Sequence, residues 1–365
     1  MAYDLKNAYM RFEHNGEPVS CERYGEGHIN DTYLLVTDDG KKKYKYLFQR
    51  INNDIFKDVP RLMQNIVLVT DFARGKIAER NGNPDRETMT VIPAIDGKPY
   101  YFDGENYFRM YKFIDNSITY QISESRETFC QSAVAFGRFA SMISDFDANQ
   151  LYESIPRFHD TRKRFGDLKD AIEKDVAGRK SEVSEEIEFA LAREKMTGLI
   201  VDKLASGEIP SRVTHNDTKL NNVLFDAETK KAIAVIDLDT IMAGSVCYDF
   251  GDSIRFGCNT AAEDETDLSA VKFDMGLFEA YTEGYLSELK DVLTESEIEN
   301  LATGALMMTY ECGIRFLEDY LRGDVYFRTS RKKHNLDRAR VQFRLLSQME
   351  EKLSEMKAVV LKYSK

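Results

Sequence analysis

The sequence predicts an α+β fold in which an N-terminal antiparallel sheet with a few helices precedes a mostly α-helical C-terminal part. Up to about residue 115, short runs of alternating apolar and polar residues are separated by glycine-bearing turns such as Asp38–Gly40, a pattern typical of strands joined by hairpins. After about residue 123, apolar residues recur with the period of a helix. A chain of 365 residues is also too long for one ordinary hydrophobic core. We therefore predict two lobes, residues 1–115 and residues 116–365.

The N-terminal lobe is expected to carry the sheet. Tyr107–Ile114 alternates apolar and polar residues as a strand does, whereas Val59–Ala78 has helical periodicity. In chain order we expect a helix over residues 4–14, a strand that ends at Val36, a strand over Tyr44–Ile51, a helix over Val59–Ala78 and strands within Met89–Ile114.

The C-terminal lobe is expected to be helical around one hairpin. Two short apolar runs, Val223–Phe225 and Ala232–Ile236, flank a turn and predict a β-hairpin. The expected helices cover residues 123–142, 158–175, 182–206, 273–290, 295–321 and 335–362. His159, at the start of the second of these segments, is interpreted as a structural residue.

Polar residues surround this hairpin at fixed spacing. The pattern His215-x-Asp217-x-Lys219-x-x-Asn222 comes just before the first strand, and Asp237 follows the second. This is the spacing of a protein-kinase catalytic loop followed by a metal-binding aspartate. Each residue type is ordinary in turns, but chance agreement at four spaced positions is improbable. The sequence therefore predicts a kinase with a protein-kinase-like two-lobed fold.

Phosphoryl transfer assigns a role to each of these residues. The reaction needs a carboxylate that accepts a hydroxyl proton, and oxygen ligands that hold Mg²⁺ on the phosphates of ATP. We predict Asp217 as the catalytic base, and Asn222 and Asp237 as the metal ligands. Lys219 is expected to offset charge on the transferred group. Asp239 is either a second metal ligand or a residue that orients Asp237, and the sequence leaves both open.

The tripeptide Asp249-Phe250-Gly251 resembles a second metal-binding motif. A metal-binding aspartate must follow the catalytic hairpin directly, however, and Asp237 does so, while Asp249 lies twelve residues later. We expect Asp249 to cap a helix and to hold the catalytic loop by hydrogen bonds.

A glycine-bearing turn in the N-terminal lobe is a candidate nucleotide contact. Gly25 and Gly27 would let backbone N–H groups approach phosphate, and Asn30 stands at the third position of an incomplete G-x-G-x-x-G pattern. Taken alone, the turn favours a plain hairpin, and it is the catalytic-loop pattern downstream that favours a nucleotide contact.

The predicted strand Tyr44–Ile51, which follows the Asp38–Gly40 turn, lacks the lysine that kinases place on the α- and β-phosphates. The phosphate-facing position is Gln49 or Arg50, and alternation puts these two on opposite faces. The helix that follows offers no glutamate over residues 63–69, so the usual lysine–glutamate pair is not expected. The adenine-contacting hinge is expected at the backbone near Lys112–Asp115, which includes Phe113, although this segment alone is also compatible with a buried edge strand.

Composition excludes several classes of protein. The net charge of −12 argues against a nucleic-acid partner, and no window approaches 18 uninterrupted apolar residues, so no membrane span is expected. Five scattered cysteines suggest neither a disulfide framework nor a zinc site. We expect a cytoplasmic protein that is a monomer or a weak homo-oligomer.

Longer segments resemble the aminoglycoside phosphotransferase-like family of small-molecule kinases, and within it the bacterial N-acetylhexosamine 1-kinases, along most of the chain. The segments that carry the resemblance are YGEGHINDTYLL, YKFIDNSITY, RVTHNDTKLNNVL, AVIDLDTIMAGSVCYDFGDSIRFG, FEAYTEGY, ECGIRFLEDYLRGDVYF and HNLDRAR. The resemblance implies ATP and Mg²⁺ as cofactors, and phosphorylation of the anomeric hydroxyl of N-acetylglucosamine or N-acetylgalactosamine.

The resemblance also implies that Arg315 and His28 bind the sugar, with Asp217 at the reacting hydroxyl. From the residues alone, Arg315 would form an ordinary intrahelical ion pair with Glu311, while Gly313 between them indicates close packing. A kinase for another sugar, choline or an aminoglycoside is the alternative. A pseudokinase is disfavoured, since the predicted base and both predicted metal ligands are present.

Overall fold

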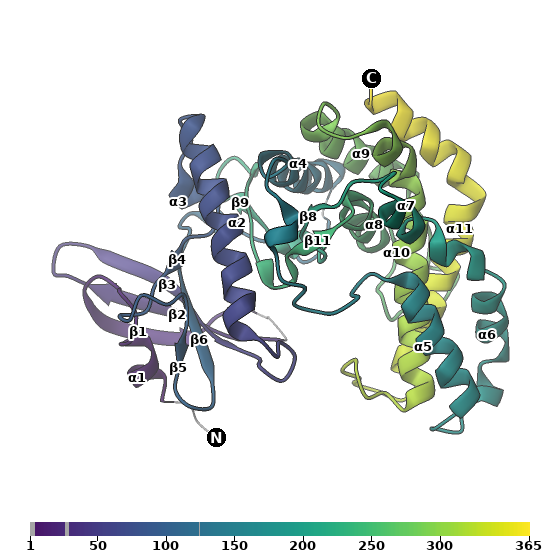
Figure 1. The fold of residues 1–365 in the computed structure, drawn as a ribbon, viewed down its shortest axis with the longest axis horizontal. Coiled ribbons are helices and arrows are strands. Elements are labelled where there is room, and N and C mark those ends of the chain that lie inside the picture. Colours follow the sequence, from purple (N-terminus) through teal and green to yellow (C-terminus); the bar gives the residue numbers. More distant parts are fainter. Residues whose placement is uncertain (1–3, 26–28, 124) are drawn as a thin grey trace. The chain divides into compact units, whose positions relative to one another are not determined.

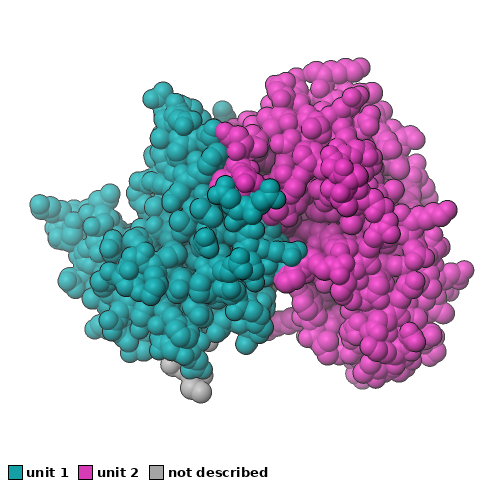
Figure 2. All heavy atoms as spheres, viewed as in Figure 1, with its two compact units in different colours: residues 1–118, 149–155, 224–242 teal, residues 119–148, 156–223, 243–365 magenta. Residues whose placement is uncertain are grey.

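The computed structural model describes residues 4–25, 29–123 and 125–365 and divides into two compact units (Figures 1 and 2). Unit 1 comprises Met1–Ile118, Asn149–Ile155 and Leu224–Met242; unit 2 comprises Thr119–Ala148, Pro156–Val223 and Ala243–Lys365. Unit 1 therefore takes in two segments from later in the chain. The lobe boundary near residue 115 stays a prediction.

Unit 1 is built on an antiparallel sheet, as predicted. The strands are β1 (Glu17–Arg23), β2 (Asp31–Asp38), β3 (Lys43–Ile51), β4 (Val91–Ile92), β5 (Tyr101–Phe102) and β6 (Tyr107–Lys112). Their order is β1-β2-β3-β6-β4, and β5 also pairs with β6. The register aligns Gln49 of β3 with Thr32 of β2 on one side and with Arg109 of β6 on the other. Three polar side chains thus form a row across the centre of the sheet.

Helices support this sheet. The predicted N-terminal helix is shorter than expected: α1 (Leu5–Tyr9) begins after Asp4, whose side chain caps it, and joins a core cluster around Phe48. The prediction for α2 (Val59–Glu79) is confirmed within one residue, and Asp58 caps its start. A short helix, α3 (Pro84–Glu87), follows.

The predicted hairpin is present. β9 (Val223–Asp226) lies between β10 (Ala232–Val235) and β7 (Ser117–Ile118) in a three-stranded sheet. The two residues of β9 that face the core, Val223 and Phe225, are apolar and completely buried. A 3-10 turn, η4 (Leu220–Asn222), leads into β9, and a second one, η5 (Leu238–Thr240), follows β10.

Unit 2 is mostly helical, as predicted. Its helices are α4 (Arg126–Met142), α5 (Thr161–Lys174), α6 (Ser184–Leu191), α7 (Val201–Ser206), α8 (Val246–Gly257), α9 (Met275–Leu289), α10 (Glu295–Arg322) and α11 (His334–Tyr363). α10 is the central helix and packs against α5, α8 and α11, while α4 packs against α9 (Figure 1). A short strand, β8 (Arg212–Thr214), precedes the catalytic loop and pairs with β11 (Met242–Gly244).

The prediction of a single helix over residues 182–206 is wrong. This segment forms α6 and α7, which are separated by a 3-10 segment, η3 (Glu194–Gly198). Thr197 and Gly198 are poor helix formers, and both are buried there. The side chain of Arg162 packs against Gly198. Tertiary packing therefore overrides the charged amphipathic pattern that predicted one long helix.

No helix of the described residues is both long and apolar enough to cross a membrane.

The crossing of α8 and α10 depends on two glycines. A Cβ at Gly251 would collide with the carbonyl oxygen of Gly304, and a Cβ at Gly304 would collide with the carbonyl of Cys247. Gly251 is the third residue of the Asp249-Phe250-Gly251 tripeptide, so close packing of two helix backbones accounts for it.

This contact predicts the effect of a single methyl group. Gly251→Ala should lower the free energy of unfolding by about 1–3 kcal/mol, because the added carbon meets backbone that cannot move aside. Gly75→Ala is the matched control, since Gly75 lies on α2 with open space around its Cβ position. That change should be neutral or should stabilise by about 0.5–1 kcal/mol. Urea unfolding of both variants checks the pair, and equal stabilities would contradict the described crossing.

Candidate active site

The catalytic loop is held in place by a buried carboxylate of α8. The backbone N–H groups of His215 and Asn216 donate to Asp249 at 2.8 and 2.7 Å. Burial raises the pKa of Asp249 despite these two donors. The predicted loop-holding role is thus confirmed, but the predicted capping role is wrong: Ser245 caps α8 through the N–H of Cys247.

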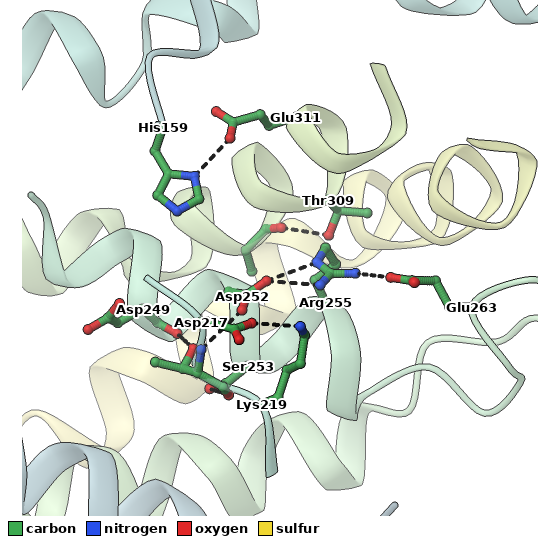
Figure 3. A network of polar contacts seen from close by, with 12 residues as sticks. His159, Asp217, Lys219, Asp249, Asp252, Ser253, Arg255, Glu263, Thr309 and Glu311 are labelled. Atoms are coloured by element: carbon green, nitrogen blue, oxygen red, sulfur yellow. Dashed lines mark hydrogen bonds and ion pairs between the residues drawn. The ribbon is translucent and has the colours of Figure 1, made fainter. Parts of the chain in front are cut away.

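A second carboxylate of α8 holds the next part of the loop. Asp252 accepts from the N–H of Thr218 at 3.1 Å, and Ser253 donates its hydroxyl to the Thr218 carbonyl at 2.7 Å. Arg255 binds Asp252 at 2.9 and 3.1 Å and Glu263 at 2.8 Å (Figure 3). Burial would raise the pKa of Asp252, but the Arg255 and Lys219 charges lower it. Asp252 therefore stays ionised and fixes Thr218.

Three of the predicted site residues meet at the end of this loop. Lys219 Nζ lies 2.7 Å from Asp217 Oδ1 (Figure 3), and the charge of Asp217 raises the pKa of Lys219. The amide nitrogen of Asn222 donates to the Asp217 carbonyl at 2.8 Å and to Oδ2 at 3.2 Å. The Asp217 side chain remains 30% exposed. Its carboxylate is thus oriented on two sides and still open to a substrate proton.

These contacts also orient Asn222. Because its amide nitrogen is directed at Asp217, its amide oxygen, the atom that binds metals, faces away from Asp217. Oxygen donors of this type suit Mg²⁺.

Asp237 belongs to unit 1 and lies on the turn after β10. It is exposed, and its backbone is left-handed, with φ 61° and ψ 61°. This conformation costs a non-glycine residue about 1–2 kcal/mol, so the surroundings must enforce it. Among the described residues, no cluster of three or more His, Cys, Asp or Glu side chains could hold a metal alone. A carboxylate and an amide oxygen nevertheless fit Mg²⁺, which typically takes one or two protein ligands beside phosphate oxygens.

Asp239 differs from Asp237 in being buried. Arg109 donates to both of its oxygens, through Nη1 to Oδ1 and through Nη2 to Oδ2 at 3.0 Å. Asn30 donates to Oδ2 at 2.6 Å. Burial would lower the pKa of Arg109, but the charge of Asp239 raises it. Both carboxylate oxygens of Asp239 therefore accept hydrogen bonds from side chains of unit 1.

Two residues predicted to contact the nucleotide take part in the same network. Gln49 donates to Thr32 Oγ1 at 2.9 Å and accepts from Arg109 Nε at 2.8 Å. Asn30, besides its bond to Asp239, accepts from the N–H of Asn52 at 3.0 Å. The amide oxygen and nitrogen of both side chains are thus engaged within unit 1.

The remaining predicted nucleotide contacts have different positions. Gly25 has φ 73° and open space around it, which suits a close approach of backbone to phosphate. Gly27 and His28 lie outside the described residues. Phe113 is half-buried, its N–H donates to the Lys45 carbonyl at 3.1 Å, and its ring lies edge-on to that of Tyr24 with centroids 5.6 Å apart. All of these assignments stay predictions.

Arg315 lies on α10 in an aromatic setting. Its guanidinium lies 5.4–5.9 Å from the ring centres of Phe158, Tyr326 and Phe327. Glu311, one turn earlier, accepts from Thr161 at 2.6 Å and contacts Nδ1 of His159 at 2.8 Å. Glu311 therefore forms its ion pair with His159, which lies before α5. The ion pair that was expected between Glu311 and Arg315 within α10 is not the one that forms.

The close packing predicted at Gly313 is confirmed. A Cβ there would lie 2.6 Å from the ring of Phe343 on α11. The absence of a side chain at this position allows α10 and α11 to approach each other.

Sequence reasoning missed Arg109 and the pair Asp252–Arg255. Arg109 stands within a run of apolar and aromatic residues on β6 and is only 1% exposed. A lone arginine in such a strand is the available signal, because a buried cation requires a buried anion. Its partner, however, lies 130 residues later in the chain.

Comparisons with known proteins agree with this description. The model of the phosphotransferase enzyme family (APH) matches residues 20–288, well over half of the chain. Similar solved structures include an aminoglycoside phosphotransferase from Alicyclobacillus acidocaldarius, with a TM-score of 0.58, 13% identity and coverage of 100% of this chain and 97% of that one. An aminopropanol kinase associated with a microcompartment has a TM-score of 0.57 and 15% identity, with coverage of 97% and 98%. A choline kinase from Cryptosporidium parvum has a TM-score of 0.54 and 15% identity, with coverage of 94% and 92%.

At these identities the structural likeness concerns the fold, which is protein-kinase-like. The family assignment rests on the family model, and it confirms the family resemblance drawn from the sequence. The chain therefore belongs to the phosphotransferase enzyme family.

Proposed function

We propose that this chain transfers the γ-phosphoryl group of ATP to the anomeric 1-hydroxyl of N-acetylglucosamine or N-acetylgalactosamine, which gives the α-1-phosphate. The observation that carries the kinase part is the arrangement of Asp217, Lys219 and Asn222. An accessible carboxylate is oriented by a cation and an amide on a loop that α8 fixes through Asp249 and Asp252.

In the proposed reaction Asp217 accepts the proton of the anomeric hydroxyl. The hydroxyl oxygen then forms a bond to the γ-phosphorus while the bond from that phosphorus to the β–γ bridging oxygen breaks, and ADP leaves. Lys219 keeps the Asp217 carboxylate in position and offsets negative charge on the transferred group. Base catalysis of this kind contributes about 10²–10⁴-fold to the rate.

Asn222 and Asp237 would hold Mg²⁺. The ion would supply positive charge at the β- and γ-phosphates. The amide oxygen of Asn222 is suited to this task because its amide nitrogen is occupied by Asp217.

The surroundings of Arg315 favour a neutral polyhydroxyl acceptor over an amine. A quaternary ammonium or amine substrate binds best to aromatic faces or to acidic side chains. Here the guanidinium of Arg315 already lies near three rings, and the nearby Glu311 is engaged by His159 and Thr161. A guanidinium can donate several hydrogen bonds to hydroxyl and carbonyl oxygens of a sugar.

A kinase for another small hydroxyl compound is the second candidate. Solved structures with the same fold include kinases of aminopropanol and choline. Such a substrate would require a site that accommodates its cationic group beside Arg315.

A substrate panel separates the two candidates. With ATP and Mg²⁺, we expect kcat/KM for an N-acetylhexosamine to exceed that for choline, 1-amino-2-propanol and kanamycin by at least about 100-fold, because a site built for sugar hydroxyls leaves polar groups unpaired with the other compounds. Phosphorus NMR should show an anomeric α-1-phosphate. Turnover of choline or kanamycin without turnover of N-acetylhexosamines would overturn the sugar assignment.

A further inference from the structure

Arg109 is the most deeply buried cation among the described residues of the sheet in unit 1, and its guanidinium is bonded to other side chains of that unit. The guanidinium of Arg109 makes a two-point contact with Asp239, and its Nε donates to Gln49 at 2.8 Å. Its guanidinium carbon lies 5.2 Å from the ring centre of Tyr111. With 1% of its surface exposed, Arg109 has no face open to a phosphate group. If it moved to bind phosphate, it would leave Asp239 as an unpaired buried charge.

Asp239 lies on the turn that carries Asp237. The side chain of Asp239 is held by Arg109 and Asn30, while the carbonyl of Ile241 accepts from Asn65 of α2 at 3.0 Å. The turn is therefore fixed both at its third residue and at its end. Leu238, between the two acids, is 1% exposed and anchors the turn in the core.

These contacts explain how Asp237 keeps its unfavourable backbone conformation. A left-handed backbone at a non-glycine residue persists only where neighbouring contacts determine it. The contacts to Asp239 and Ile241 supply that constraint on the side of the turn that follows Asp237, while β10 supplies it on the other.

We propose that Arg109, Asn30, Gln49 and Asp239, here called the Asp239 cluster, are positioning residues that hold Asp237 for the metal-bound nucleotide. In this role Asp239 is not a second metal ligand, and Asn30 and Gln49 act through Asp239 and Arg109 instead of contacting phosphate. The inference rests on the proposed function only in requiring that the chain binds a magnesium–nucleotide complex.

The test compares nucleotide affinity with and without Mg²⁺, so it does not depend on turnover. Titration calorimetry with adenylyl imidodiphosphate gives two Kd values, and their ratio is the Mg²⁺ enhancement. The variant is Arg109→Met with Asp239→Asn, which removes both charges together and so leaves no unpaired buried ion. We expect the Kd without Mg²⁺ to change by less than about threefold and the enhancement to fall by about 10–100-fold, as is usual for residues that orient a metal ligand.

The matched control is Lys98→Met with Asp96→Asn. This exposed ion pair, at 2.8 Å, lies between β4 and β5 of unit 1, and among the described contacts its two side chains bond only to each other and to the backbone of their own turn. Its removal should leave the enhancement within about twofold of wild type. An enhancement within about twofold of wild type in the Arg109/Asp239 variant would overturn the inference.

Single variants keep the inference testable if the double variant fails to fold. Asn30→Ala retains the ion pair and removes one bond to Asp239; it should lower the enhancement while the Kd without Mg²⁺ stays the same. Equal weakening with and without Mg²⁺ would identify Asn30 as a direct nucleotide contact and would overturn the inference. Failure of the wild-type chain to bind the nucleotide at all would instead refute the proposed function and this inference with it.

Discussion

Asp217→Asn is expected to lower kcat by about 10²–10⁴-fold, because an amide cannot accept the proton of the attacking hydroxyl. The affinity for ATP should change little, since Asp217 contacts Lys219 and Asn222 and is proposed to face the acceptor hydroxyl. Steady-state kinetics with N-acetylglucosamine, together with nucleotide titration, separates the two effects.

Asp202→Asn is the matched control for this substitution. Asp202 is an exposed acid of unit 2 that pairs with Arg162 at the surface. Its replacement should leave kcat within about twofold of wild type, because exposed ion pairs contribute little. Near-normal turnover in Asp217→Asn would remove the base assignment.

Asp249→Ala is expected to have the largest effect on stability among substitutions at the site. The change removes the carboxylate that accepts from the buried N–H groups of His215 and Asn216. The loss of each such bond from a buried donor costs about 1–3 kcal/mol, so the free energy of unfolding should fall by about 2–6 kcal/mol. Turnover per folded molecule should also fall, because Asp217 follows directly after the released segment. Chemical unfolding measures the first effect and active-site titration the second.

Asp249→Asn gives a graded comparison, and Asp267→Ala gives a control. The amide introduced by Asp249→Asn would retain one acceptor oxygen, so the stability of this variant should lie between those of wild type and the alanine variant. Asp267 is exposed and bonds only within its own turn among the described contacts. If Asp249→Ala and Asp267→Ala had the same stability, the hydrogen bonds from the loop to Asp249 would not be what holds the catalytic loop.

The parts of the site that were predicted correctly depend on residues close together in the chain. The spacing from His215 to Asn222 and the two apolar runs after it predicted the loop and the hairpin, because both are local structures. The expectation that Asp249 holds the loop also followed from distance along the chain, whereas the metal role of Asp237 stays a prediction. Asp249 is indeed within α8 and bonds to the loop backbone.

The parts that could not be predicted depend on partners far apart in the chain. Arg109 and Asp239 are separated by 130 residues, and His159 and Glu311 by 152. Spacing rules do not reach across such distances, so Glu311 was paired with the nearest cation on its own helix. Similarly, nothing close to Gln49 and Asn30 in the chain indicated that they bond to Arg109 and Asp239, respectively, and their predicted nucleotide contacts stay predictions.

A crystal structure with Mg²⁺, adenylyl imidodiphosphate and N-acetylglucosamine tests the central claim most directly. We expect an Asp217 carboxylate oxygen to lie within hydrogen-bonding distance of the anomeric hydroxyl, and Asn222 and Asp237 to bind the metal. A sugar whose anomeric hydroxyl lies away from Asp217, or a metal held by neither of those residues, would contradict it.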